Sequence, residues 1–266
     1  MSYMDIGEKI MIDYNNYMEA FNATAAKDRI VEWIKEWFAD NSPADSVAVV
    51  GISGGKDSSV VAALCVEALG RERVYGITMP NGGQSDIDDS MKLINHLGIH
   101  HFNHNIINEY EDILSQAWGN LIEVNKRLSA QTKINLGPRL RMSVLYAYSQ
   151  SLNGRVACTD NLSESYIGYS TRWGDSVGDF APIAAYTSDE VIAIGHALHL
   201  PEELLVKAPA DGLCGKTDED NFGFTYRALN EYIRLGQIED MDVKKKIDHL
   251  HNINAFKRQP IAMFTY

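Results

Sequence analysis

Residues 46–70 read SVAVVGISGGKDSSVVAALCVEALG and contain an apolar run, a glycine pair and a second apolar segment in direct succession. The run at 47–52 is short and rich in β-branched residues, which is typical of a strand buried in a parallel sheet. The segment that starts near Ser58 stays largely apolar until Gly70, and glycine commonly ends helices. The stretch therefore predicts a strand, a tight turn and a helix, the repeating unit of α/β folds.

The same alternation continues on both sides of this unit. Further strands are predicted at 73–79, 99–107 and 155–159, with helices within 3–20 and at 25–38, 85–97, 188–198, 226–235 and 243–250. This order predicts an α/β protein with a doubly wound, mainly parallel sheet flanked by helices, in which ligands bind beyond the carboxyl ends of the strands. A chain of 266 residues is expected to form a single domain, 1–266.

Three segments break the alternation. Two helices are predicted at 108–128 and 139–152, separated by a loop that contains Gly137 and Pro138. The stretches 165–181 and 208–223 show no periodicity, and the first is rich in Gly, Ser, Tyr and Asp. Long loops in a compact domain are usually functional, so both are expected near a site.

The composition limits the possible partners. A formal net charge of -12 disfavours a nucleic-acid binder, because phosphate backbones are held mainly by Lys and Arg. Three widely spaced cysteines without C-x-x-C spacing indicate a reducing compartment and no zinc site. No stretch is long and apolar enough to span a membrane and no leader peptide is evident, so a cytoplasmic protein is expected.

The glycine turn has the features of a phosphate-binding loop. Backbone N–H groups and the positive end of a helix dipole point at whatever lies above such a turn. Gly54 and Gly55 allow the backbone to approach phosphate oxygens, Ser53 and Ser58 offer hydroxyl groups, and Asp57 suits a magnesium ion. The spacing matches neither G-x-x-x-x-G-K-[ST] nor G-x-G-x-x-G. The alternative is an ordinary helix start capped by Ser and Asp.

The sequence pattern S-G-G-x-D-S at 53–58 resembles the signature motif of the PP-loop ATP pyrophosphatases. Members of that superfamily amidate nicotinate adenine dinucleotide, make GMP or asparagine, or modify tRNA by thiolation or lysidine formation. All of them activate a carbonyl or carboxyl oxygen by adenylation. The loop alone therefore leaves these chemistries open.

Segments elsewhere in the chain separate these chemistries. CTDNLSES at 158–165, TRWGD at 171–175 and GDFAP at 178–182 resemble, in order, the G-T-x-x-x-x-E, T-K/R-x-G-D and G-D elements of ammonia-dependent NAD synthetase. LGPRLRM at 136–142, TDED at 217–220 with the following GFTY, and FKR at 256–258 resemble further elements of the same family. The resemblance extends in order over about residues 30–264.

This resemblance implies a set of site residues. Those implied to bind ATP are Gly51, Ile52, Ser53, Gly54, Gly55, Lys56, Asp57, Ser58, Thr159, Ser188 and Ala210. Those implied to bind deamido-NAD are Arg139, Arg172, Asp179, Phe256 and Lys257. Asp57 and Glu164 are implied to hold Mg²⁺ and, together with Asp179, to be the catalytic residues.

Three positions depart from the family pattern. Ser188 stands where the family commonly has a lysine, so a cation that faces phosphate is absent or comes from elsewhere, with Lys216 as a candidate. Ala210 replaces a hydroxyl residue, and Phe256 replaces the usual histidine before Lys257. None of these changes affects the two carboxylates or the glycine loop, so activity is expected to survive.

The resemblance also implies a reaction and its partners. Deamido-NAD attacks the α-phosphorus of ATP, and free ammonia then converts the adenylated carboxylate to the amide of NAD. A homodimer is implied, with the substrate site at the interface and the interface on residues 108–152. Two alternatives remain, a tRNA-modifying PP-loop enzyme and a non-catalytic adenine-nucleotide sensor. The acidic composition weighs against the first of these.

Overall fold

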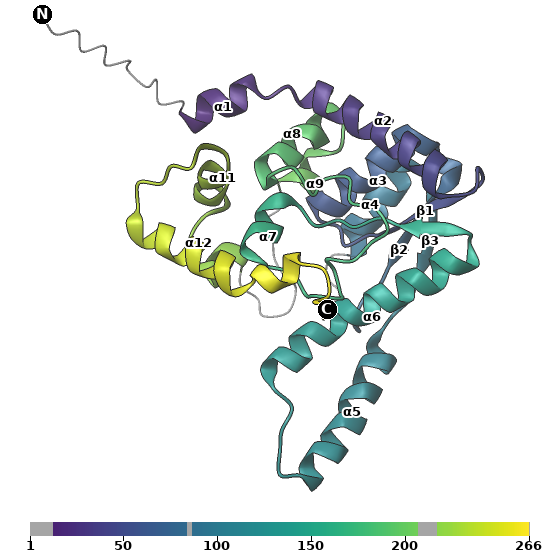
Figure 1. Cartoon of the computed structure of the whole chain (residues 1–266). Coiled ribbons are helices and arrows are strands. Elements are labelled where there is room, and N and C mark those ends of the chain that lie inside the picture. Colours follow the sequence, from purple (N-terminus) through teal and green to yellow (C-terminus); the bar gives the residue numbers. More distant parts are fainter. Residues whose placement is uncertain (1–12, 84–86, 207–216, 266) are drawn as a thin grey trace, which may run out of the picture.

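The computed structural model describes residues 13–83, 87–206 and 217–265 (Figure 1). Its strands are β1 (Val47–Gly51), β2 (Val74–Thr78), β3 (His100–Asn103) and β4 (Gly154–Val156). Its helices are α1 (Tyr14–Ala20), α2 (Ala23–Asn41), α3 (Lys56–Leu69), η1 (Arg71–Arg73), α4 (Ile87–Leu97), α5 (Ile107–Glu123), α6 (Ala130–Ser151), α7 (Leu162–Ile167), α8 (Ser188–Ala197), α9 (Glu202–Leu205), α10 (Asp218–Phe222), α11 (Tyr226–Leu235), α12 (Met241–Ile253) and η2 (Ala255–Arg258).

The described strands form one parallel sheet in the order β3-β2-β1-β4. Val49 of β1 pairs with Tyr75 of β2 on one side and with Val156 of β4 on the other. The chain therefore moves outward from β1 in both directions, which confirms the predicted doubly wound, parallel α/β sheet. In such sheets the ligand crevice lies at the carboxyl ends of the strands where the order reverses, here between β1 and β4.

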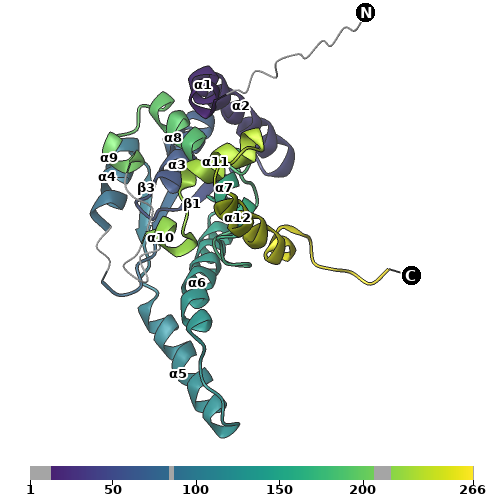
Figure 2. The ribbon, with the colours of Figure 1, turned by 90° about the vertical axis from the view of Figure 1, so that its left-hand side faces the viewer.

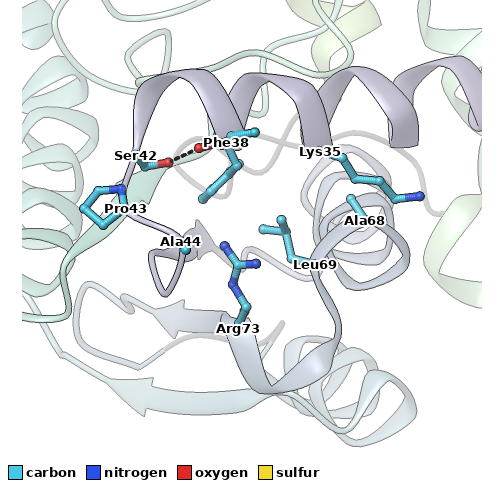
Figure 3. A pocket seen from close by; sticks show the side chains of 9 residues that line it. Lys35, Phe38, Ser42, Pro43, Ala44, Ala68, Leu69 and Arg73 are labelled. Carbon is cyan, nitrogen blue, oxygen red and sulfur yellow. Dashed lines mark hydrogen bonds between the residues drawn. The ribbon is translucent and has the colours of Figure 1, made fainter.

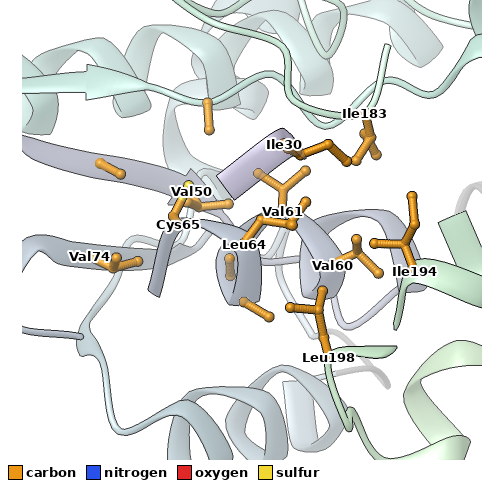
Figure 4. Packing of buried hydrophobic residues seen from close by; sticks show 14 of the residues in the cluster. Ile30, Val50, Val60, Val61, Leu64, Cys65, Val74, Ile183, Ile194 and Leu198 are labelled. Carbon is orange, nitrogen blue, oxygen red and sulfur yellow. The ribbon is translucent and has the colours of Figure 1, made fainter. Parts of the chain in front are cut away.

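The main hydrophobic core lies between the sheet and helices α2, α3 and α8. Ile30 of α2, Val50 of β1, Leu64 of α3 and Ile194 of α8 meet there and are at most 5% exposed (Figure 4). Burial of such a side chain contributes about 1.5–3 kcal/mol relative to full exposure. This packing holds the amino end of α3 against the carboxyl end of β1, where the glycine loop lies.

The other face of the sheet packs on α6. Val49 and Ile77 point to this side and are fully buried, and Leu145 and Tyr148 of α6 pack against them. Helices α5 and α6 form a hairpin that projects away from the body of the protein (Figures 1 and 2). The sheet is thus covered by helices on both faces, as predicted.

Three predicted boundaries were wrong. Pro138 lies inside α6 and not in a loop, although proline removes one helical hydrogen bond. Ser129 caps this helix by accepting a bond from Thr132 N, and Arg141 Nε donates to the carbonyl oxygen of Met79, so the helix is held on both sides of the proline. The break between the two helices lies instead at residues 124–129.

Strand β3 is shorter than the strand predicted at 99–107. Helix α7 lies where a polar run and an aperiodic loop were expected. Asn105 Oδ1 accepts bonds from the backbone N–H groups of Gly82 and Ile107, which turns the chain out of β3. Asn161 and Glu164 form a capping box that starts α7 within the polar run after β4. Helix α7 packs with α11 and α12 in a second apolar cluster that contains Ile167 and Leu229.

No helix in the described residues is long and apolar enough to cross a membrane. The thiols of Cys65 and Cys158 are buried and unpaired, and Cys214 lies outside the described residues.

Candidate active site

The glycine loop lies at the carboxyl end of β1, at residues 52–55. Gly54 has a φ of +82°, in the left-handed region that glycine adopts without strain. Gly55 is the N-cap of α3 and has no side chain with which to accept a bond from the first N–H groups of the helix. Those groups and the helix dipole therefore suit an anion, as expected for a phosphate loop.

The predicted loop hydroxyls are close together. Ser53 Oγ and Ser58 Oγ are 3.2 Å apart, and Ser58 Oγ donates to the Gly55 carbonyl oxygen at 3.1 Å. The Ile52 N–H donates to the carbonyl oxygen of Ile77 at 2.9 Å, which anchors the start of the loop to β2. The structure thus brings together the serines and glycines that the sequence singles out at 51–58.

Asn161 connects the two carboxylates predicted to hold a metal. Its Nδ2 donates to Asp57 Oδ1 at 3.0 Å, and its Oδ1 accepts from the Glu164 backbone N–H at 3.0 Å. Burial and the negative charge of Asp57 raise the pKa of Glu164 well above its ordinary value. Asp57 and Glu164 therefore lie within electrostatic range of each other, although they are far apart in sequence.

This pair of carboxylates fits a magnesium ion. Mg²⁺ is usually held by one or two carboxylates together with substrate phosphates and water, and a dedicated protein cage is unusual. The described residues contain no group of three or more His, Cys, Asp or Glu side chains that could hold a metal ion. A divalent cation would also relieve the repulsion that disfavours ionised Glu164.

Lys56 turns into the protein beside the same carboxylates. Its Nζ is 2.7 Å from Asp57 Oδ2 and 5.6 Å from the centre of the Tyr226 ring. Burial by itself lowers the pKa of Lys56, but Asp57, Glu164 and Asp218 outweigh it, so the pKa is raised. The late segment that contains Asp218 and Tyr226 therefore packs onto the glycine loop, a contact that sequence reasoning missed.

A second pair of carboxylates lies beyond β4. Burial and the nearby Asp175 raise the pKa of Asp160 to about 7. Asp175 Oδ1 accepts a bond from the Thr171 N–H at 2.6 Å, although the residue as a whole is exposed. Loss of solvation by the surrounding protein raises the pKa of Asp175, which overcomes the effect of that bond. Neither residue was predicted to have a role, although Asp160 lies in the segment 158–165 and Asp175 in the segment 171–175.

Lys257 supplies positive charge to this second pair. Its Nζ donates to the carbonyl oxygens of Gly168 and Ser170, at 2.7 and 2.9 Å. Burial lowers its pKa, while Asp175 and Asp160 act in the opposite direction. The C-terminal segment thus reaches the loop after α7.

Aromatic rings enclose the Arg172 guanidinium. Its centre lies 4.9 Å from the Trp173 ring and 5.4 Å from the Phe256 ring. Arg139 Nε donates to the Arg172 carbonyl oxygen at 3.3 Å. Trp173 has a φ of +63°, which is unusual for a residue with a bulky side chain. Three of the residues predicted to bind deamido-NAD therefore form one surface with an additional tryptophan.

Asp179 contacts β4 and helix α6. Its Oδ2 accepts from the Val156 N–H at 2.7 Å, and its Oδ1 accepts from the Tyr146 hydroxyl at 3.2 Å. The side chain is exposed, so a substrate can still reach it. These bonds give Asp179 a structural role whether or not it takes part in the reaction.

The other residues predicted to contact ATP lie outside the glycine loop. Ser188 is buried, and its N–H donates to Ser163 Oγ, which in turn donates to Asn230 Oδ1. Thr159 is half-buried between β4 and α7. Ala210 and Lys216 lie outside the described residues.

A separate cavity of about 380 Å³ opens near the amino ends of β1 and β2, opposite the glycine loop. It lies beside the loop that leads into β1 and is lined by Phe38, Pro43, Leu69 and Arg73 among others (Figure 3). The Arg73 guanidinium donates to the Ser46 carbonyl oxygen and so braces the start of β1. None of the predicted site residues lines this cavity.

The chain is similar to known proteins over most of its length. The sequence profile of the NAD synthase family matches residues 26–263. The chain is 36% identical over 236 residues to the NH(3)-dependent NAD(+) synthetase of Alkaliphilus metalliredigens, covering 87% of this chain and 94% of that protein. The solved NMN synthetase of Francisella tularensis gives a TM-score of 0.84 at 32% identity, covering 92% of this chain and 100% of that chain.

A second solved structure, the NH3-dependent NAD synthetase of Campylobacter jejuni, gives a TM-score of 0.75 at 26% identity, covering 92% of this chain and 100% of that chain. The order of strands, the loop at the end of β1 and the carboxylates beside it all lie within the segment that the family profile matches. The chain therefore belongs to the NAD synthase family.

Proposed function

We propose that the protein amidates deamido-NAD with ammonia and ATP, giving NAD, AMP and pyrophosphate. The observation that carries this proposal is the Asp57–Asn161–Glu164 arrangement beside an anion-binding helix start, in a chain of the NAD synthase family. The enzyme is then a ligase that forms a C–N bond. Residues 1–266 act as one domain in this proposal, which the unbroken family match over 26–263 supports.

The glycine loop binds the phosphates of ATP. The substrate carboxylate attacks the α-phosphorus, an O–P bond forms, and the bond between the α-phosphorus and the bridging oxygen breaks. Pyrophosphate leaves at the loop, where the N–H groups at the start of α3 stabilise its charge. Thr159 and Ser188 contribute to the ATP side of the site, together with Ala210 of the segment outside the described residues.

Asp57 and Glu164 hold magnesium in this proposal. The ion supplies charge neutralisation to the phosphates when it is bound. Asn161 keeps both carboxylates in place, since it bonds to the side chain of one and caps the helix that carries the other. Catalysis then consists mainly of positioning and charge stabilisation, without a nucleophilic side chain.

Deamido-NAD binds on the side of Arg172. Arg139 and Arg172 suit the phosphates or the carboxylate of the dinucleotide, and Phe256 offers a ring for stacking. Lys257 and Asp179 complete this side of the site. The exposed faces of Trp173 and Phe256 place apolar surface next to the guanidinium, as recognition of a charged heteroaromatic ring requires.

The second step needs a group that accepts a proton from the attacking nitrogen. Ammonia attacks the adenylated carbonyl carbon, AMP leaves, and the nitrogen loses a proton. We assign this role to the Asp160–Asp175 pair, because Asp160 has a pKa of about 7 and can accept a proton near neutrality. Asp179, the residue implied by the resemblance, is the alternative acceptor.

A smaller substrate is the second candidate. The NMN synthetase of Francisella tularensis is similar along its whole length, which favours nicotinate mononucleotide as a competing acceptor of ammonia. This molecule carries the same carboxypyridine ring but lacks the adenylate half. Both substrates would use the same glycine loop and the same carboxylates.

The projecting hairpin is the proposed dimer interface. Exposed apolar side chains lie along α5 and at the start of α6, where a monomer would leave them in water; they are Ile113, Trp118, Ile122, Val124 and Ile134. A second copy of the chain would cover them and place two sites near one interface.

We also place the enzyme in the cytoplasm, with which the unpaired thiols of Cys65 and Cys158 agree.

One assay separates these candidates. The protein is incubated with ATP, magnesium chloride and ammonium chloride, and with either deamido-NAD or nicotinate mononucleotide, and AMP and the amidated product are quantified by chromatography. AMP and NAD formed in equal amounts support the main proposal, and a higher kcat/KM for the mononucleotide favours the second. Binding of ATP without AMP formation would favour the nucleotide sensor, and AMP formation only with added tRNA would favour the tRNA-modifying enzyme.

A further inference from the structure

Lys56 carries a buried ammonium group within the glycine loop. Its side chain is 6% exposed, and its Nζ is hydrogen-bonded to Asp57 Oδ2 at 2.7 Å. Glu164 and Asp218 add negative charge around it, and the Tyr226 ring lies 5.6 Å away. Carboxyl groups from α3, α7 and α10 therefore act electrostatically on one ammonium group, and that of Asp57 is hydrogen-bonded to it.

The burial of Lys56 indicates a role inside the protein. A buried lysine is stable only when its charge is paired, and the surrounding carboxylates repel one another unless a cation lies among them. Tyr226 OH donates to Asp218 Oδ2 at 3.1 Å, which holds this carboxylate and the ring over the ammonium. Lys56 thus links the loop to the segment at the start of α11.

The contact with Asp57 has a consequence for metal binding. A divalent cation on Asp57 would share that carboxylate with the Lys56 ammonium, and like charges at such short range repel strongly. Metal and ammonium therefore compete for the same negative charge. The phosphates of a nucleotide at the loop would offer the ammonium another partner.

We propose that Lys56 is a built-in counter-ion that competes with the divalent metal for Asp57, so that the metal binds weakly until nucleotide phosphates are present. This inference rests on the proposed function in one respect, the assignment of the metal to Asp57 and Glu164. Nucleotide would then bind before the metal, because its phosphates draw the Lys56 ammonium away and leave the Asp57 carboxylate free for the metal. Lys56 also stabilises the segment at Asp218 and Tyr226 when no metal is bound.

The test measures metal binding without turnover. Lys56→Gln keeps a hydrogen-bond donor near Asp57 but removes the charge, and Mn²⁺ serves as the probe, followed by calorimetry and by electron paramagnetic resonance. Without nucleotide, Lys56→Gln should bind Mn²⁺ on the order of tenfold more tightly than the wild type. Its melting temperature should fall in EDTA and recover with Mg²⁺, whereas that of the wild type should change little with Mg²⁺ alone.

Lys27→Gln is the matched control. Lys27 is also largely covered, 16% exposed, and its ammonium pairs with Asp28 and Glu67 at 3.2 and 3.1 Å, outside the candidate site. Its loss removes one positive charge from the protein without changing the carboxylates of the site. Mn²⁺ binding by Lys27→Gln should therefore remain at the wild-type level.

Two results would overturn the inference. One is Mn²⁺ binding by Lys56→Gln that is no tighter than in the wild type, and the other is tight Mn²⁺ binding by the wild type that inorganic pyrophosphate does not increase. The second measurement needs no variant, so the inference stays testable even if Lys56→Gln does not fold. If Mn²⁺ binding changes as expected but the wild type does not amidate deamido-NAD, only the proposed function is contradicted. If the wild type is active but Lys56→Gln binds Mn²⁺ as the wild type does, only the role of Lys56 is contradicted.

Discussion

The Asn161 side chain donates to Asp57 Oδ1 at 3.0 Å while its own oxygen accepts the Glu164 N–H at the same distance. One side-chain amide therefore holds the Asp57 carboxylate directly and the first turn of the helix that carries Glu164. It also caps α7, so the local fold and the site depend on the same group. This relationship leads to the first prediction.

Asn161→Ala should lower both stability and activity. Loss of the cap should cost about 1 kcal/mol of the free energy of unfolding, measured by urea denaturation. Loss of the bond to Asp57 should in addition raise the KM for magnesium–ATP. Asn22→Ala is the control, because Asn22 caps α2 through a bond to Ala25 N outside the site. A KM for ATP that is unchanged in Asn161→Ala would contradict the positioning role.

Removal of either carboxylate charge should abolish most of the activity without unfolding the protein. Asp57→Asn and Glu164→Gln should each lower kcat/KM on the order of 100-fold or more, because each removes a proposed metal ligand from the proposed adenylation step. Glu164 has a raised pKa in the folded protein, so its ionised form destabilises the fold at neutral pH. The melting temperature of Glu164→Gln in EDTA should therefore equal or exceed that of the wild type, and full activity in either variant would disprove the metal assignment.

The pH dependence of the protein's stability should reflect the titration of Asp160. Because its folded-state pKa is raised to about 7 from 3.8, the protonated form is favoured in the folded protein. The stabilisation that it contributes is complete below the unfolded pKa and is lost as pH rises towards 7. Melting temperatures measured from pH 4 to pH 8 should therefore fall less steeply for Asp160→Asn than for the wild type.

The same residue should shape the pH–rate profile. If the Asp160–Asp175 pair accepts the proton, kcat of the wild type should rise with pH through about 7, and Asp160→Asn should lose that limb. The experiment holds the concentration of free ammonia, rather than of total ammonium, constant at each pH. An identical limb in both proteins would point to Asp179 or to another acceptor.

The aromatic surface around Arg172 should determine the affinity for the second substrate. Phe256→Ala and Arg172→Ala should raise the KM for deamido-NAD several-fold while the KM for ATP changes little, because the Arg172 guanidinium lies 5.4 Å from the Phe256 ring and both groups are proposed to bind the dinucleotide. Comparison with nicotinate mononucleotide shows which half of the substrate they contact. Equal changes in both KM values for ATP and deamido-NAD would indicate a structural effect instead.

The hairpin prediction concerns assembly. Trp118→Glu places a charge on the exposed apolar face of α5, which should convert a dimer to a monomer in sedimentation velocity experiments. Glu111→Gln, a change at an exposed position of the same helix, is the control. A wild-type protein that sediments as a monomer would contradict the proposed interface.

The local elements around the glycine loop could be predicted because their signals are local. Residues 47–52 have the β-branched run of a buried strand, and the parallel, doubly wound sheet follows from the alternation of strands and helices. Pro138 shows the limit of this approach. A proline normally ends a helix, but contacts from Arg141 to Met79 and the cap at Ser129 hold α6 together across it.

The sequence by itself determined the glycine loop and the motifs that contain Asp57 and Glu164, which the resemblance implies as metal ligands. Only the tertiary structure decided that Asn161 bonds to both, that Lys56 turns inward towards Asp218, and that Asp160 and Asp175 act on each other. The physical reason is that burial and charge pairing depend on distances between segments that lie far apart along the chain, such as those of Lys56 and Asp218. Such distances exist only once the sheet has brought the carboxyl ends of β1 and β4 together.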